Sequence, residues 1–252
     1  MNSNQNIPPL EFDINWWEQW IKKDFMVQIE LFTQTIEEKL LVGFKDLKKE
    51  ADQVTDDALS SIGKRWNPDT DPSEAYDAAQ DAGINYFSSM QAVEQTLLNS
   101  CVVSLYQLFE QQRIYILRKE FLENCKTPKS SDFTAKEFKR ALKRCDIDIE
   151  IFDSWPKVKE MHSLCNAIKH AEGWSSKKLK QSRPDLFQYS KSEKEGESVH
   201  PWLSDSKLYF TLSGDGIYVT FKDLKAYTAS LIQFWDELIQ AAYLIQAEDT
   251  TV

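Results

Sequence analysis

The sequence predicts a mainly α-helical protein: a helical bundle with two long helices and a small β-hairpin late in the chain. Three observations support this fold class. The 252 residues include only seven glycines and eight prolines, a composition that favours long uninterrupted helices over folds with many turns. Apolar residues recur every three to five positions over long stretches, as they do on one face of an α-helix. One short stretch near the C-terminus instead concentrates β-branched and aromatic residues, which favour strands.

Two long helices are predicted in the N-terminal half of the chain. Residues 1–11 show no periodic apolar pattern and are expected to form a flexible leader, followed by a long amphipathic helix within residues 12–66. Turn-forming residues at 67–73 end this helix, because proline, asparagine and aspartate favour turns. We expect Ser73 to cap the second long helix, which continues with a bend at Gly83.

Residues 73–247 are expected to form the core bundle, within a single domain that spans the chain. Thr134, with Glu137 three positions later, has the spacing of a capping box and predicts a short helix. Pro156 indicates the first turn of a further helix. A β-hairpin is predicted at residues 207–221, where β-branched and aromatic residues flank a Ser-Gly-Asp-Gly turn. A final amphipathic helix follows the hairpin.

Charge is distributed unevenly along the chain. The formal net charge of −10 argues against a protein whose whole surface grips nucleic acid. Between Lys126 and Arg183, however, the sequence has fourteen Lys and Arg against eight Asp and Glu. This basic middle segment fits either an electrostatic footprint for phosphate groups or a solvated helical face.

Neither a membrane nor a metal is expected as a partner. The N-terminus lacks an apolar signal segment, and no stretch approaches the ~20 uncharged apolar residues that cross a bilayer, so a cytoplasmic location is predicted. The four cysteines lie at least twenty residues apart, without a CxxC pair or a histidine cluster. This spacing indicates neither a zinc knuckle nor a redox motif. We therefore expect buried or inert thiols, no metal and no cofactor.

A polar row stands out in the segment that runs from residue 161 to residue 173. His162, Asn166 and His170 are spaced four residues apart, which places them along one face of a helix. A rise of ~1.5 Å per residue puts the two histidines about 12 Å apart, too far to share a metal ion. We therefore expect no metal site from these residues alone.

Two segments of the chain resemble the HEPN superfamily: Val-Val-Ser-Leu-Tyr-Gln-Leu-Phe-Glu at 102–110 and Asn-Ala-Ile-Lys-His-Ala-Glu-Gly at 166–173. The resemblance covers residues 80–245. The family motif is an Arg, commonly followed by a polar residue, with a His four to six residues after the Arg. Asn166 and His170 match the polar position and the His, while Cys165 holds the Arg position. The resemblance implies a helical bundle, often dimeric, and a metal-independent ribonuclease of a prokaryotic antiviral-defence or toxin–antitoxin module.

Cleavage of RNA through its own 2′-hydroxyl requires a base for that proton and a cation for the phosphate. The resemblance implies His170 as the base and Asn166 as an assisting group, and Lys169, next to the histidine, is the expected substitute for the arginine charge. Lys169 can act as a point charge, although it lacks the forked donor set of arginine. The residues expected to bind RNA are cations of the basic middle segment: Lys139, Arg140, Lys143, Arg144, Lys177 and Lys178.

Other interpretations remain open at this point. Cys165 in the Arg position also fits a catalytically inactive interaction or regulatory subunit, which binds a partner protein encoded in the same operon. A third hypothesis is that the chain binds nucleic acid without catalysing a reaction.

Individual residues also have alternative roles. Asn166 and His170 equally fit hydrogen bonds across a bundle or a dimer interface. Arg113 and Arg118 lie with Glu110 on the second long helix and either complete a composite site or form ordinary surface ion pairs.

A homodimer is predicted, because one helical row offers few groups for a phosphate site and a two-fold axis doubles them. The two copies of His170 would then face a shared groove lined by Lys and Arg of residues 126–183. Tryptophans are numerous enough that some are expected at the interface. The candidates are Trp16, Trp17, Trp20, Trp155 and Trp235.

Overall fold

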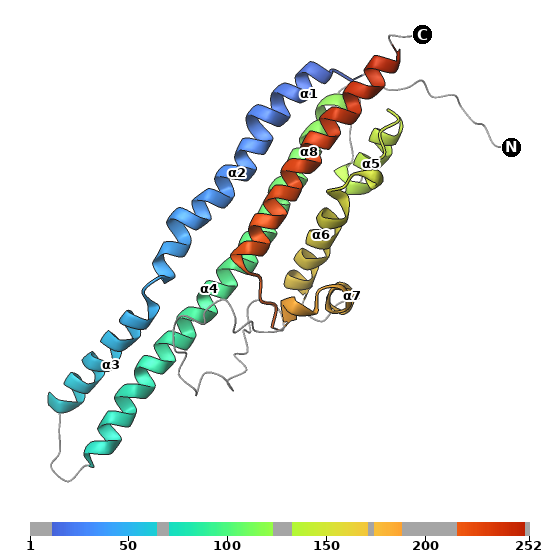
Figure 1. Cartoon of the computed structure of the whole chain (residues 1–252). Helices are drawn as coiled ribbons and strands as arrows, with labels where there is room; N and C mark the ends of the chain where they lie inside the picture. Colours follow the sequence, from blue (N-terminus) through green and yellow to red (C-terminus); the bar gives the residue numbers. More distant parts are fainter. Residues whose placement is uncertain (1–11, 65–70, 123–132, 171–173, 188–215, 250–252) are drawn as a thin grey trace. The chain divides into compact units, whose positions relative to one another are not determined.

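The computed structural model describes residues 12–64, 71–122, 133–170, 174–187 and 216–249. All regular structure in these ranges is helical, which confirms the predicted mainly α fold (Figure 1). The chain divides into two compact units, which are considered separately. The first unit comprises Met1–Gln34, Val102–Cys165 and Phe221–Val252, and the second comprises Thr35–Cys101 and Asn166–Thr220. The expected leader, residues 1–11, lies outside the described residues.

The first long helix predicted from the sequence is confirmed, as a run of consecutive helical segments. These are α1 (Ile14–Trp20), η1 (Ile21–Phe25), α2 (Met26–Thr35), η2 (Ile36–Leu40), η3 (Leu41–Phe44) and α3 (Leu47–Lys64). The Asp13 carboxylate accepts a hydrogen bond from Trp16 N at 3.1 Å and so caps α1. η1 and η2 are wider π-helical turns and η3 is a 3-10 turn. The apolar period therefore predicted the extent of the run, but not its irregular turns.

The second long helix is α4 (Pro72–Ile116), which continues into the π-helical turn η4 (Leu117–Phe121). Its N-cap is Asp71 rather than the predicted Ser73. The Asp71 carboxylate accepts a hydrogen bond from Ser73 N at 2.9 Å, and this bond lowers the pKa of Asp71. Pro72 occupies the first helical position, where its missing N–H costs nothing. The helix continues through Gly83 without interruption.

The later elements are short, except for the last. They are α5 (Ala135–Lys143), η6 (Ile149–Ile151), α6 (Trp155–His170), α7 (Trp174–Ser182), η7 (Pro184–Phe187) and α8 (Phe221–Asp249). The hydroxyl of Thr134 accepts a hydrogen bond from Glu137 N at 3.3 Å, which confirms the predicted start of α5. Pro156 lies in the first turn of α6, as predicted.

Aromatic rings form the core of the first unit. Phe109 of α4 contacts Phe234 and Trp235 of α8, with ring centroids 5.1 and 5.4 Å apart, and Phe25 of η1 lies 5.3 Å from Trp235. These side chains are buried. Figure 1 shows α8 beside α1, in agreement with the contacts between them. Trp17 and Trp235, both predicted as candidates for a dimer interface, are fully buried in this unit, so the bundle itself uses them.

A buried amide links the helices around this core. Gln112 is only 3% exposed. Its Nε2 donates to the carbonyl oxygen of Phe25 at 3.1 Å, and its Oε1 accepts a hydrogen bond from Trp235 Nε1 at 3.0 Å. A second buried bond, 2.6 Å long, joins the hydroxyls of Thr33 and Thr228. The first unit therefore combines apolar packing with hydrogen bonds that give the buried side chains of Gln112, Thr33 and Thr228 polar partners.

The second unit contains a close helix contact at Gly83. A Cβ atom added there would overlap the Thr55 hydroxyl of α3 and lie 2.9 Å from the carbonyl oxygen of Ala51. The absence of a side chain thus lets α3 and the first part of α4 approach one another closely. One turn further along α4, the hydroxyl of Tyr86 donates to a Glu50 carboxylate oxygen at 2.7 Å.

The predicted hairpin at 207–221 is not seen. Residues 207–215 lie outside the described residues, and residues 217–220 belong to no helix or strand of the described part. Asn99 of α4, fully buried, donates to the carbonyl oxygen of Ile217 at 2.9 Å and accepts from Val219 N at 3.4 Å.

Two further hydrogen bonds hold residues 217–220. Gln95 donates to the carbonyl oxygen of Val219 at 2.9 Å, and Tyr218 N donates to the carbonyl oxygen of Leu186 in η7 at 2.7 Å. Helical side chains and a 3-10 turn therefore satisfy the backbone groups that a partner strand would otherwise satisfy. The β-branched pattern predicted a strand here, and it did not reveal this source of hydrogen bonds.

We expect Gly83→Ala to lower the free energy of unfolding by about 1–3 kcal/mol, because a methyl group overpacks the contact between α3 and α4. Gly63→Ala is the matched control: no atom lies within 4 Å of its Cβ position. That substitution should raise the free energy of unfolding by about 0.4–1 kcal/mol. Urea denaturation followed by circular dichroism measures both. A Gly83→Ala protein as stable as Gly63→Ala would contradict the close contact.

Candidate functional site

Helix α6 has one buried face and one exposed face. The buried residues are Val158, Met161, Leu164, Cys165 and Ala167. The exposed residues include Lys159, His162, Lys169 and His170. The two histidines of the predicted polar row are therefore exposed, and Asn166 between them is half-buried.

The three predicted catalytic residues occupy the last turn of α6. Lys169 and His170 are exposed, and Asn166 is half-buried. At 100° per residue, Lys169 and His170 project about 60° and about 40° to either side of Asn166. A base, a cation and an amide thus share one outward surface, at the helix end where a positive charge is favourable.

Cys165 lies on the other side of the same helix. It is 1% exposed, and its thiol donates to the carbonyl oxygen of Val102 on α4 at 3.7 Å. Five residues separate Cys165 from His170, so their side chains diverge by about 140°. The position that matches the family Arg is therefore a core position in this chain, and Cys165 contributes packing rather than charge.

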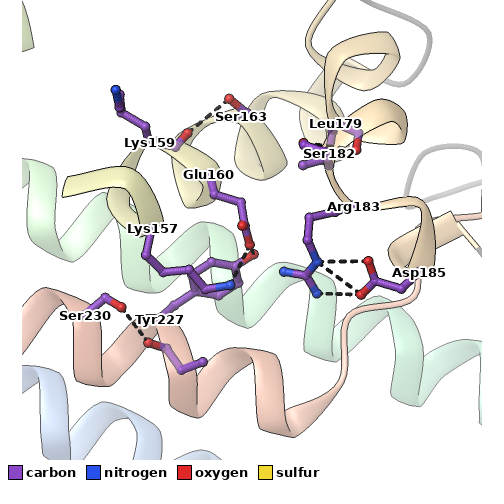
Figure 2. A network of polar contacts seen from close by, with 11 residues as sticks. Lys157, Lys159, Glu160, Ser163, Leu179, Ser182, Arg183, Asp185, Tyr227 and Ser230 are labelled. Carbon is purple, nitrogen blue, oxygen red and sulfur yellow. Dashed lines mark hydrogen bonds and ion pairs between the residues drawn. The ribbon is translucent and has the colours of Figure 1, made fainter. Parts of the chain in front are cut away.

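Polar contacts with α8 orient α6 within the first unit. Glu160 accepts a hydrogen bond from the Tyr227 hydroxyl at 2.8 Å and pairs with Lys157 at 2.7 Å (Figure 2). The Lys157 ammonium also lies 4.8 Å from the Tyr227 ring centroid. At the start of the helix, the Glu237 carboxylate accepts hydrogen bonds from Asp153 N, Ser154 N and the Ser154 hydroxyl. This carboxylate complements the positive end of the helix dipole.

His162 contacts an aromatic residue that the sequence did not single out. Its imidazole stacks on the Tyr106 ring of α4 at 5.4 Å, and burial raises the pKa of Tyr106. Arg113 lies two turns further along α4, with its guanidinium 3.5 Å from the Tyr106 hydroxyl. The seven-residue spacing of Tyr106 and Arg113 was the available sign that they share a face.

Arg113 is a core residue in this structure. It is 5% exposed, and its guanidinium lies 4.7 Å above the Phe109 ring. Its contact with a Glu110 oxygen is 3.5 Å long, and its Nε has no hydrogen-bond partner in the described part of the chain. Arg118 is exposed and stacks on Phe133 at 5.0 Å. Arg113 is therefore buried and Arg118 is exposed, so the two arginines do not form the composite site considered from the sequence.

The predicted RNA-binding cations on α5 are largely engaged by carboxylates. Lys139 pairs with Glu150 at 2.6 Å and lowers the pKa of that carboxyl. Lys143 pairs with Asp148 at 3.1 Å, and Arg140 pairs with Glu137 at 2.8 Å. Arg144 is exposed. The interpretation of the basic segment as a solvated helical face therefore fits α5 well.

The predicted cations on α7 have different surroundings. Lys177 and Lys178 are exposed, and no carboxylate of the described residues pairs with either. The Lys178 ammonium lies 5.3 Å from the ring centroid of Trp174, which is 76% exposed. Trp174 belongs to this surface and was missed from the sequence, although a tryptophan four residues before a lysine on a helix was the available signal.

The cysteines that the structure describes are buried. Burial raises the pKa of both Cys101 and Cys145 to about 11, so neither thiol is a ready nucleophile near neutral pH. Within the described ranges, no group of three His, Cys, Asp or Glu side chains is placed to hold a metal ion. No helix in those ranges is both long enough and apolar enough to cross a membrane.

Comparisons with known proteins assign no family to this chain. No model of a known protein family matches the sequence, and no curated protein or solved structure is significantly similar. The HEPN resemblance therefore rests on two short segments, residues 102–110 and 166–173.

Placing the arginine of the HEPN motif at residue 165 should damage the fold. We expect Cys165→Arg to lower the free energy of unfolding by about 3–5 kcal/mol, because it places an uncompensated charge in the core. Ser163→Arg on the half-exposed side of α6 should change it by no more than about 0.5 kcal/mol. Thermal denaturation of the two variants tests this expectation. Wild-type stability of Cys165→Arg would show that the side chain at this position can reach solvent.

Proposed function

We propose that the chain is a HEPN-like protein of a prokaryotic antiviral-defence or toxin–antitoxin module, which acts on RNA as a metal-independent ribonuclease. The observation that supports this most directly is the exposure of His170 and Lys169 beside the half-buried Asn166 at the end of α6. A histidine in such a setting is available to exchange protons with a bound substrate.

In the proposed reaction, His170 accepts the proton of a ribose 2′-hydroxyl. The 2′-oxygen forms a bond to phosphorus, and the bond from phosphorus to the 5′-oxygen breaks. The products are a 2′,3′-cyclic phosphate and a 5′-hydroxyl, which takes its proton from water. Lys169 contributes a charge next to the phosphate and Asn166 a hydrogen bond, so electrostatic stabilisation is modest without a forked arginine.

A specific observation favours a second candidate function, in which the chain is a catalytically inactive interaction or regulatory subunit. Cys165 is 1% exposed, and an arginine at this position would be buried. A chain whose motif position lies in the core lacks the permanent cation that the chemistry requires. In this case the exposed end of α6 contacts a partner protein instead of RNA.

Incubation of purified protein with total RNA in the presence of a chelator separates the two candidates. We expect wild-type cleavage products that end in a 2′,3′-cyclic phosphate, and about a 10²–10⁴-fold slower rate for His170→Ala, because the general base is lost. His162→Ala removes another exposed histidine of the same helix and should cleave at the wild-type rate. A wild-type protein that leaves RNA intact would favour the inactive subunit.

We further propose a homodimer in which two copies of His170 contribute to one groove. The support is chemical: a single α6 end supplies one base and one lysine, and a two-fold axis doubles both. Burial of Trp17 and Trp235 removes part of the aromatic surface that suggested an interface. Multi-angle light scattering at micromolar concentration should give twice the mass of the chain. A monomer mass at that concentration would contradict the proposal.

A further inference from the structure

Trp174 is unusual because it leaves a large aromatic ring in water. Its exposed fraction is 76%, on a helix whose Ser176 and Leu179 are buried. Burying an aromatic side chain is strongly favourable, so an exposed tryptophan marks a surface that gains much from a ligand.

The surroundings of Trp174 on α7 are cationic. Lys178 lies over its ring, and Lys177 and Lys180 are exposed on the same short helix. The nearest carboxylate in sequence among the described residues is Asp185. It forms a forked ion pair with Arg183, at 2.7 Å from Nη2 (Figure 2). Among the described residues, Lys177 and Lys178 form no ion pair with a carboxylate, while the Lys180 ammonium lies 4.9 Å from the Phe187 ring centroid.

The chemistry of this surface favours one class of ligand. A protein partner that buries a tryptophan usually surrounds it with further apolar contacts, whereas the other exposed residues of α7 are lysine, glutamine and serine. A single aromatic ring among lysines suits a single strand of nucleic acid, in which a base stacks on the ring and phosphates meet the cations. The net charge of −10 makes this a local feature, not a property of the whole surface.

We propose that Trp174, Lys177 and Lys178 form a stacking platform for an unpaired base of single-stranded RNA. The platform rests on the proposed function in taking RNA as the ligand, and it names the strand type and the residue that holds the base. A base inside a duplex is already stacked on its neighbours, so the platform discriminates against double-stranded RNA.

Fluorescence anisotropy with a labelled single-stranded 12-mer RNA tests the platform, with His170→Ala protein used throughout so that the probe stays intact. We expect an added Trp174→Ala change to weaken binding about ten-fold or more, since base stacking on an aromatic ring contributes about 1–3 kcal/mol. Trp174→Phe should keep most of the affinity. Ile151→Ala alters another highly exposed apolar side chain and should leave binding unchanged.

The contribution of the lysines is measured separately, through the salt dependence of RNA binding. The double change Lys177→Ala and Lys178→Ala should flatten the dependence of log affinity on log salt, by about 0.7 for each phosphate that the protein no longer neutralises. Trp174→Ala should leave that slope unchanged, because stacking releases no counterions. The duplex form of the 12-mer should bind more weakly than the single strand.

The outcomes distinguish this proposal from the ribonuclease proposal. One outcome is that the wild type cleaves RNA and the Trp174→Ala change leaves the affinity for single-stranded RNA unchanged. This outcome would overturn the platform and leave the ribonuclease proposal standing. Single-strand binding that depends on Trp174, without cleavage by the wild type, would overturn the ribonuclease and support the platform. Equal affinity for duplex and single strand would also overturn the platform. Far-ultraviolet circular dichroism confirms that each variant is folded.

Discussion

The buried amide of Gln112 joins three helical segments of the first unit. An amide carries both donors and an acceptor, and each needs a partner once it leaves water. Gln112 finds them in the Phe25 carbonyl and the Trp235 indole, so η1, α4 and α8 meet at one axial position. A slip of one helix by a single residue would leave a buried polar group unpaired, at a cost of about 1–3 kcal/mol. The aromatic rings around it consequently pack in one arrangement.

The outward surface of α6 depends on contacts with α4 and α8 in the first unit. Glu237 and Tyr227 of α8 meet the first half of α6, and the Val102 carbonyl receives the Cys165 thiol. Within the first unit these contacts bury one side of α6 and leave Lys159 and His162 exposed. Along the same helix, the side chains of Cys165 and His170 diverge by about 140°, so the burial of Cys165 is compatible with an exposed candidate base.

The sequence predicted the helix starts well, because these depend on interactions between residues that are close together in the chain. The capping box at Thr134 and the turn residues before α4 act over two or three residues, and both mark real helix starts, although the second cap is Asp71. Residues 217–220 were predicted as one strand of a hairpin, but their partner Asn99 lies about 120 residues away in sequence. The row of His162, Asn166 and His170 followed from helical spacing. The burial of Cys165 and Arg113 depends on neighbouring helices, which no local pattern reveals.

The glycine contact between α3 and α4 constrains how the chain can change in length. Ala51 and Thr55 face Gly83 because they lie four residues apart on one side of α3. A single residue inserted before them would turn that side away by about 100° and bring a different side chain against the glycine. Two whole turns, about seven residues, would restore the facing side chains almost completely. Related chains should therefore tolerate substitutions along these helices far more readily than single-residue insertions or deletions.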